Sequence, residues 1–480
     1  MKTATVPTST KSSPHTAIMA EVGGIIGIVG TQVMEGIPES QEKFITLLRE
    51  LEDLVSQRRK EINYNYDHRD YRKRLCQSDE VFEKTLQEKV LSIPEIQELY
   101  YEIISLFQES DREVAGKKIQ KEYLTDLVFE SMENIEWGEF KNLIIQNQKS
   151  KDKKQNLERY KQKIQAMQSR GARHLILRGN ELGKHLGKDG VIELIKYLKG
   201  SEIQVFVLSG YDLGQIFGKD GMVESAQALK GSRVRALDLN GNKLGQILGK
   251  DGIVEYTRAL KGSEVRILSL SGNELGEFLE KDGMIELAEV LGPSKIQALE
   301  LGGNELGKYL GANGIIGFVK ALKGSEIRVL DLSGNELGRY LGTERIIELI
   351  ETLHENGVRN VNLRNNRLGG YLGKDGMIAF AHALKGSEIR VLDLSGNELG
   401  KNLEADGMIA FAEALRGSKI QGLDLSWNKL CKYLEADEIV EFVKVLNGIG
   451  IQKLNLELNQ IQEETQQELL EAFPEIHFDF

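Results

Sequence analysis

The chain has 480 residues with 62 Lys+Arg against 73 Asp+Glu, and the 40% that are hydrophobic suffice for a large core while excluding a polytopic membrane protein. The net charge of -11 disfavours nucleic acid as a partner, because phosphate binding draws on surplus Lys and Arg. Two cysteines, Cys76 and Cys431, are too few for a disulfide scaffold and indicate a reducing, cytoplasmic compartment.

Residues 1–36 are rich in Ser and Thr and contain a Gly-rich apolar run at 20–33. Glu21 and Gln32 interrupt this run, which is shorter than the roughly 20 residues that a membrane-spanning helix needs. The nearest lysines lie far ahead of it and no small-residue cleavage site follows, which disfavours a signal peptide. We expect a flexible leader without stable membrane insertion, and a membrane-touching role for the Gly-rich run stays open.

Residues 37–170 predict an all-helical domain. Phe44, Leu47 and Leu51 follow helical spacing, and similar patterns recur along the segment. Its last part, 141–170, holds nine basic residues against two acidic ones. We interpret that part as a basic linker helix that docks on the domain after it, and the alternative is a dedicated site for a partner or nucleic acid. The helical domain resembles no family.

From residue 171 onward the string LDLSGNELG recurs in ten variants at a step of 31 residues. The segment at 324–338 returns unchanged at 386–400, which indicates duplication of one unit. The first Leu of each match, or its substitute, lies at Leu175, Phe206, Leu237, Leu268, Leu299, Leu330, Val361, Leu392, Leu423 and Leu454.

Each unit predicts one strand followed by one helix. Leu330 and Leu332 alternate along a short strand, and Asn335 is expected to turn inward and bond backbone groups left unpaired where the strand ends. Asp251 and its equivalents in other repeats are placed as helix N-caps, and a Gly column that includes Gly386 is placed at the helix ends. Between Asn and helix lies an additional apolar column: Leu186, Phe217, Leu248, Leu279, Leu310, Leu341, Leu372, Leu403 and Leu434.

The residues Ile327, Leu330, Leu332, Asn335 and Leu337 match IxxLxLxxNxL, so the pattern resembles the leucine-rich repeat family. The helix-bearing, Gly-rich version is similar to the ribonuclease inhibitor class. This resemblance implies an α/β solenoid over 171–480, with a parallel sheet on the concave face and helices on the convex face. After the ten repeats, a helix at 463–473 and a last alternating strand that includes Phe478 are expected to form a C-terminal cap.

Sequence signals for catalysis are poor. The chain contains no GxxxxGK[ST], HExxH, GxSxG or CxxC string, and its seven His residues are scattered. We therefore expect neither an enzyme nor a bound cofactor or metal.

The repeat alignment instead indicates a binding surface. The residue between the two Leu positions faces away from the helices, and five of the ten such residues are acidic. We interpret them as an acidic concave face that captures a protein with a basic surface, with Trp427 in a Gly position and Tyr211 in an Asn position as aromatic anchors. The acidic residues are Asp238, Glu300, Asp331, Asp393 and Asp424.

Other interpretations remain open. One alternative is a neutral scaffold, in which the Asp is inherited with the duplicated unit and an Arg column that includes Arg235, Arg328 and Arg390 neutralises part of its field. Ran GTPase-activating proteins are built from similar repeats, but the acidic tail typical of that family is missing here. Near-identical repeats behind an unrelated helical domain also resemble effectors that host-associated bacteria deliver into eukaryotic cytosol.

Overall fold

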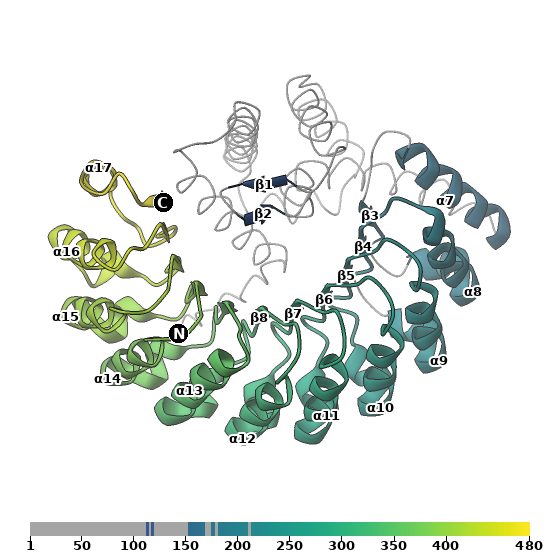
Figure 1. Cartoon of the computed structure of the whole chain (residues 1–480), viewed down its shortest axis with the longest axis horizontal. Coiled ribbons are helices and arrows are strands. Elements are labelled where there is room, and N and C mark those ends of the chain that lie inside the picture. The colour runs from purple at the N-terminus through teal and green to yellow at the C-terminus, as the bar shows by residue number, and fades with distance from the viewer. Residues whose placement is uncertain (1–111, 115–116, 120–151, 169–173, 178–180, 210–212) are drawn as a thin grey trace, which may run out of the picture.

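The chain forms a curved solenoid in which short strands line the inner side and helices line the outer side (Figure 1). This computed structural model describes residues 112–114, 117–119, 152–168, 174–177, 181–209 and 213–480.

The sheet has eleven parallel strands in sequence order, each paired with the strands of the neighbouring repeats. Its register is the repeat register, since Leu330 lies opposite Leu299 on one side and Val361 on the other. The strands are β3 (His174–Ile176), β4 (Val205–Val207), β5 (Ala236–Asp238), β6 (Ile267–Ser269), β7 (Ala298–Glu300), β8 (Val329–Asp331), β9 (Asn360–Asn362), β10 (Val391–Asp393), β11 (Gly422–Asp424), β12 (Lys453–Asn455) and β13 (His477–Asp479).

One helix follows each of the strands β3 to β10, and the core lies between these helices and the sheet. Leu330 and Leu332 are fully buried there, as their alternation predicts. The helices are α8 (Glu181–Tyr197), α9 (Leu213–Ala228), α10 (Leu244–Ala259), α11 (Leu275–Leu291), α12 (Leu306–Ala321), α13 (Leu337–Glu355), α14 (Leu368–Ala383) and α15 (Leu399–Ala414); short helical turns η1 (Leu198–Gly200) and η2 (Leu430–Lys432), then α16 (Ala436–Asn447) and α17 (Glu463–Ala472), complete the set.

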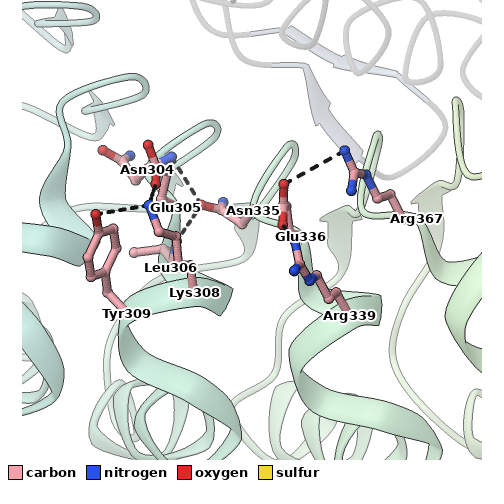
Figure 2. Close-up of polar contacts among 9 residues, drawn as sticks. All are labelled: Asn304, Glu305, Leu306, Lys308, Tyr309, Asn335, Glu336, Arg339 and Arg367. Atoms are coloured by element: carbon pink, nitrogen blue, oxygen red, sulfur yellow. Dashed lines mark hydrogen bonds and ion pairs between the residues drawn. The ribbon is translucent and has the colours of Figure 1, made fainter.

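A buried asparagine ladder joins successive repeats, as expected. Asn335 is fully buried, and its Nδ2 donates to the carbonyl oxygens of Leu301 and Leu332, each at 3.0 Å. Its Oδ1 accepts from the backbone N–H groups of Asn304 and Leu306 in the preceding repeat, at 3.0 and 3.1 Å (Figure 2). Its Nδ2 also donates to the Ser333 carbonyl oxygen at 3.1 Å, so one side chain bonds five backbone groups at the ends of the three-residue strands.

The interpretation of the Asp column as helix N-caps is wrong, because the helices begin earlier. Helix α10 starts at Leu244 and is broken at Gly249, where φ is 60°. Asp251 therefore lies inside the second helical segment, two residues beyond the break. This short first segment accommodates the extra length of the 31-residue unit, and it buries Leu248 against the core.

Both ends of the solenoid are closed. At the N-terminal end, α7 (Lys153–Gln168), which lies in the stretch interpreted as a basic linker helix, packs against α8 and buries Tyr160 and Ile164 in the common core. At the C-terminal end, β13 pairs with β12, and the Phe478 and Phe480 rings stack at 5.3 Å, at the place where the cap was expected.

The structure adds an antiparallel strand pair to the stretch expected to be all-helical. Strands β1 (Arg112–Val114) and β2 (Lys117–Ile119) pair with Val114 opposite Lys117, so two residues, Ala115 and Gly116, connect them. A two-residue connection with Gly is typical of a tight hairpin, a signal that helical spacing does not contain. The leader and the rest of the helical domain, apart from α7, lie outside the described residues.

Candidate interaction surface

The inner side of the sheet presents two rows of side chains, because strand residues alternate between its faces. Leu330 points toward the helices, so Val329 and Asp331 point into the concavity. The first row also contains Ala298, Asn360, Gly422 and Lys453. We call its partly exposed aliphatic members the aliphatic row: Val205, Ala236, Ile267, Val329 and Val391. The second, the acidic row, is formed by Asp238, Glu300, Asp331, Asp393 and Asp424.

The strand register places members of the acidic row side by side. Glu300 lies opposite Asp331, and Asp393 lies opposite Asp424. Asp238 is separated from Glu300 by Ser269, whose hydroxyl contacts both Glu300 and Asn240. The five residues predicted from sequence therefore lie in one row across seven neighbouring strands.

The acidic row is far less exposed than a free charged surface would be. Asp238, Glu300, Asp331 and Asp393 expose only 9%, 5%, 6% and 8% of their surface, and Asp424 is partly buried. The curvature of the sheet crowds neighbouring strands on the inner side, a consequence that the repeat alignment cannot show.

Several acidic residues also have a structural task at the end of their strand. Asp331 Oδ1 accepts the backbone N–H of Ser333 at 2.7 Å, and Asp393 and Asp424 accept the equivalent N–H groups of Ser395 and Ser426, both at 2.8 Å. The acidic column is therefore more than a charge pattern, since it also fixes the turn that follows each strand.

Burial perturbs the protonation of the row. Burial, together with the neighbouring Asp424 carboxyl, raises the pKa of Asp393 to about 7. Burial also raises the pKa of Asp331 and of Asp424 above the ordinary Asp value. Part of the charge counted from the sequence is thus neutralised by protons near neutral pH.

The cation that faces the acidic row is Arg364, which the sequence-based hypothesis missed. Arg364 occupies the slot of Ser333 and Ser395, and its charge lowers the pKa values of Asp331, Asp393 and Asp424 against the effect of burial. The Arg column was expected to have this role, but Arg266 and Arg390 act on Glu264 and Glu388 instead. The signal in the sequence was a charged residue in a column that is mostly Ser, Asn or Gly, where Arg178 and Glu457 are the other charged members.

The turns beyond the strands carry a further acidic column, and two of its members are paired with basic side chains. Glu305 binds Lys308 at 2.7 Å, and Glu336 contacts Arg339 at 3.4 Å and Arg367 at 3.8 Å (Figure 2).

The aromatic residues of the expected surface differ in their surroundings. Trp427 exposes 54% of its surface, whereas Tyr211 lies outside the described residues. In the loop column that includes Tyr309 and Tyr340, the rings pack against the core, as expected. Tyr371 is an exception at 50% exposure. Leu458, 57% exposed, lies in the same column as Trp427 one repeat later and was also missed.

Neither metal-binding nor membrane-spanning features stand out in the described ranges. Over those residues, His, Cys, Asp and Glu side chains form no group of three that could hold a metal ion. Among the helices so described, none combines the length and apolarity that crossing a membrane requires.

Comparison with known proteins gives little further information. No protein-family model and no curated protein matches the chain. Among solved structures, a chain of the Rad7 and Elc1 complex from yeast is similar, with 15% sequence identity and a TM-score of 0.32, over 61% of this chain and 77% of that one.

Proposed function

We propose that the solenoid is a leucine-rich repeat module of the ribonuclease inhibitor-like class, and that its concave face binds a protein with a basic surface without catalysing a reaction. The assignment to this class is supported by the consensus columns, whose Leu residues are buried and whose Asn residues form the ladder. Ten near-regular repeats are typical of proteins that offer an extended concave surface to a partner.

The observation that carries the binding proposal is the pair of in-register rows on the inner side of the sheet. The described helices lie on the outer side, so the two rows face the concavity (Figure 1). The aliphatic row is partly exposed and adjoins carboxyls of low solvent exposure. Desolvated carboxyls attract an inserted Lys or Arg more strongly than exposed ones, because the local dielectric is lower.

The test is affinity capture with the full chain as bait, followed by titration of the captured protein. The bait variant combines Glu300→Gln, Asp331→Asn, Asp393→Asn and Asp424→Asn. These changes remove charge yet keep the side-chain oxygens that accept the backbone N–H groups at the strand ends. We expect the wild-type chain to bind a basic protein in a salt-sensitive manner and the variant to lose that binding.

A matched control removes four carboxylates from the exposed helical side. The variant Asp189→Asn, Asp220→Asn, Asp251→Asn, Asp282→Asn changes the net charge by the same amount, and all four residues are exposed. Binding that weakens equally in both variants would show that net charge alone attracts the partner. Binding that survives the concave variant would contradict the proposal.

A further inference from the structure

One column of the repeat changes its chemistry at the C-terminal end of the solenoid. This column lies in the turn, three residues after the last residue of each strand, and its φ is positive in the repeats from β5 onward that the structure describes. Gly241, Gly272, Gly303, Gly334 and Gly396 occupy it in five repeats. In the last two repeats it holds Trp427, with φ 58°, and Leu458, with φ 57°.

Folding gains little from these two residues. A residue with a Cβ in the left-handed region costs about 1–2 kcal/mol relative to its ordinary conformation, which glycine avoids. Neither side chain recovers this cost by full burial, since Trp427 and Leu458 expose 54% and 57% of their surface. The two turns are neighbours, joined by a hydrogen bond of 3.0 Å from the Trp427 N–H to the Glu457 carbonyl oxygen. They therefore form one exposed apolar patch in adjacent repeats.

The charges around this patch are mostly negative. The strand-end turns at 393–399, 424–430 and 455–461 contain four carboxyl residues and one basic residue. An anionic membrane surface or nucleic acid would be repelled by this arrangement, whereas a basic segment would be attracted. The charged residues are Asp393, Glu398, Asp424, Lys429 and Glu457.

We propose that Trp427 and Leu458 form a docking site for an apolar side chain of a protein segment whose flanking residues are basic. The site is continuous with the acidic row, because Asp424 and Trp427 belong to the same turn. The inference rests on the proposed concave binding function. It adds that one end of the partner's bound segment is anchored at repeats nine and ten.

Tryptophan fluorescence gives a direct readout. The chain has only two Trp residues, so Trp137→Phe in the full chain leaves Trp427 as the sole emitter. The probes are Lys-rich peptide pools with one central Leu or Phe, the same pools with Ala at the centre, and Glu-rich pools with a central Leu. We expect a saturable blue shift and protection from iodide quenching with the first pools only. No response to any pool, or an equal response to the Ala pools, would overturn the proposal.

Substitution to glycine separates docking from folding. In Trp427→Gly with Leu458→Gly, the turns take the residue that other repeats use there. We expect an unfolding midpoint close to that of the wild-type chain and at least tenfold weaker binding of the peptides and of the partner that the concave face captures. The control is Asn365→Gly, a change at the same column with φ 54° that removes no apolar surface, and it should bind as the wild type does.

The outcomes distinguish this inference from the function on which it rests. The captured partner is measured against both variants. If the variant with the neutralised acidic row no longer binds it, but the Trp427→Gly, Leu458→Gly variant binds it with unchanged affinity, the docking site is overturned and concave binding is left intact. A second outcome concerns self-association, measured by sedimentation. If the full chain self-associates, the double variant does not, and no peptide pool gives a response, the occupant of the patch is a second copy of the chain and the proposed peptide docking site is overturned.

Discussion

At the scale of single residues, the acidic row combines a folding task with an electrostatic cost. Asp393 Oδ1 accepts a backbone N–H, which requires an acceptor but not a charge. The same carboxyl is 8% exposed and lies opposite Asp424 in the next strand. Its ionised form is disfavoured both by burial and by the neighbouring carboxyl, so the folded chain holds a proton there more tightly than the unfolded chain does.

The pH dependence of stability follows from this difference. The pKa of Asp393 is raised to about 7 in the folded state, against about 3.9 when unfolded. The folded state therefore gains from the proton at low pH, and the free energy of unfolding falls as the pH rises from about 4 to 7, by about 1.4 kcal/mol per unit of pKa shift. Urea titrations across this range should show the fall in the wild-type chain.

Replacing Asp393 by its neutral isostere Asn tests whether this residue holds the proton. Asp393→Asn keeps the acceptor oxygen, so we expect it to stabilise the chain above pH 7 and to flatten the profile between pH 4 and 7. Asp375→Asn, at an exposed position of α14, should leave the profile unchanged. A profile that keeps its slope in Asp393→Asn would show that the proton is held elsewhere.

At the scale of the repeat, contacts between neighbouring units explain why certain columns of the alignment hold glycine. Gly307 is the second residue of α12, and its N–H donates to the Asn335 carbonyl oxygen of the next repeat at 3.0 Å. A Cβ at this position would lie 2.6 Å from that oxygen. The glycine is therefore required by close approach of the next repeat, and not by its own backbone conformation.

Two glycine-to-alanine changes distinguish the close contact at Gly307 from the general effect of placing Ala instead of Gly in a helix. Gly307→Ala should lower the free energy of unfolding by about 2 kcal/mol or more, because backbone must move to accept the methyl group. Gly370→Ala, in α14 where a Cβ would meet nothing within 4 Å, should raise it by about 0.5–1 kcal/mol. Equal effects of the two changes in thermal melts would contradict the close-contact explanation.

The sequence predicts much of the unit and misses what depends on neighbours. Strand, ladder and buried columns follow from the spacing of Leu330, Leu332 and Asn335, since these obey local periodicity. The break at Gly249 was not predicted, because a Gly with an Asp two positions later is equally compatible with a helix N-cap at that Asp. The low exposure of Asp331 and the role of Arg364 could not be predicted either, since both depend on how tightly adjacent strands are crowded.

At the scale of the whole molecule, each repeat contacts chiefly its neighbours, and the ends depend on their caps. Removal of residues 463–480 deletes α17 and β13 and leaves the edge of β12 unpaired. Hydrogen exchange should then show lost protection that is greatest at β12 and decays toward β5, as expected for a quasi-one-dimensional fold. A uniform loss across all strands would instead indicate a single cooperative unit.

Binding on the concave face should be linked to protonation, which gives the most direct measurement. A basic partner favours the ionised form of Asp393, so binding should release protons near neutral pH and the affinity should rise from pH 6 to pH 8. Isothermal titration of the captured partner in buffers of different ionisation enthalpy measures both quantities. We expect proton release in the wild-type chain and almost none in Asp393→Asn. Binding with no proton release and no pH dependence in the wild-type chain would contradict a partner seated on the acidic row.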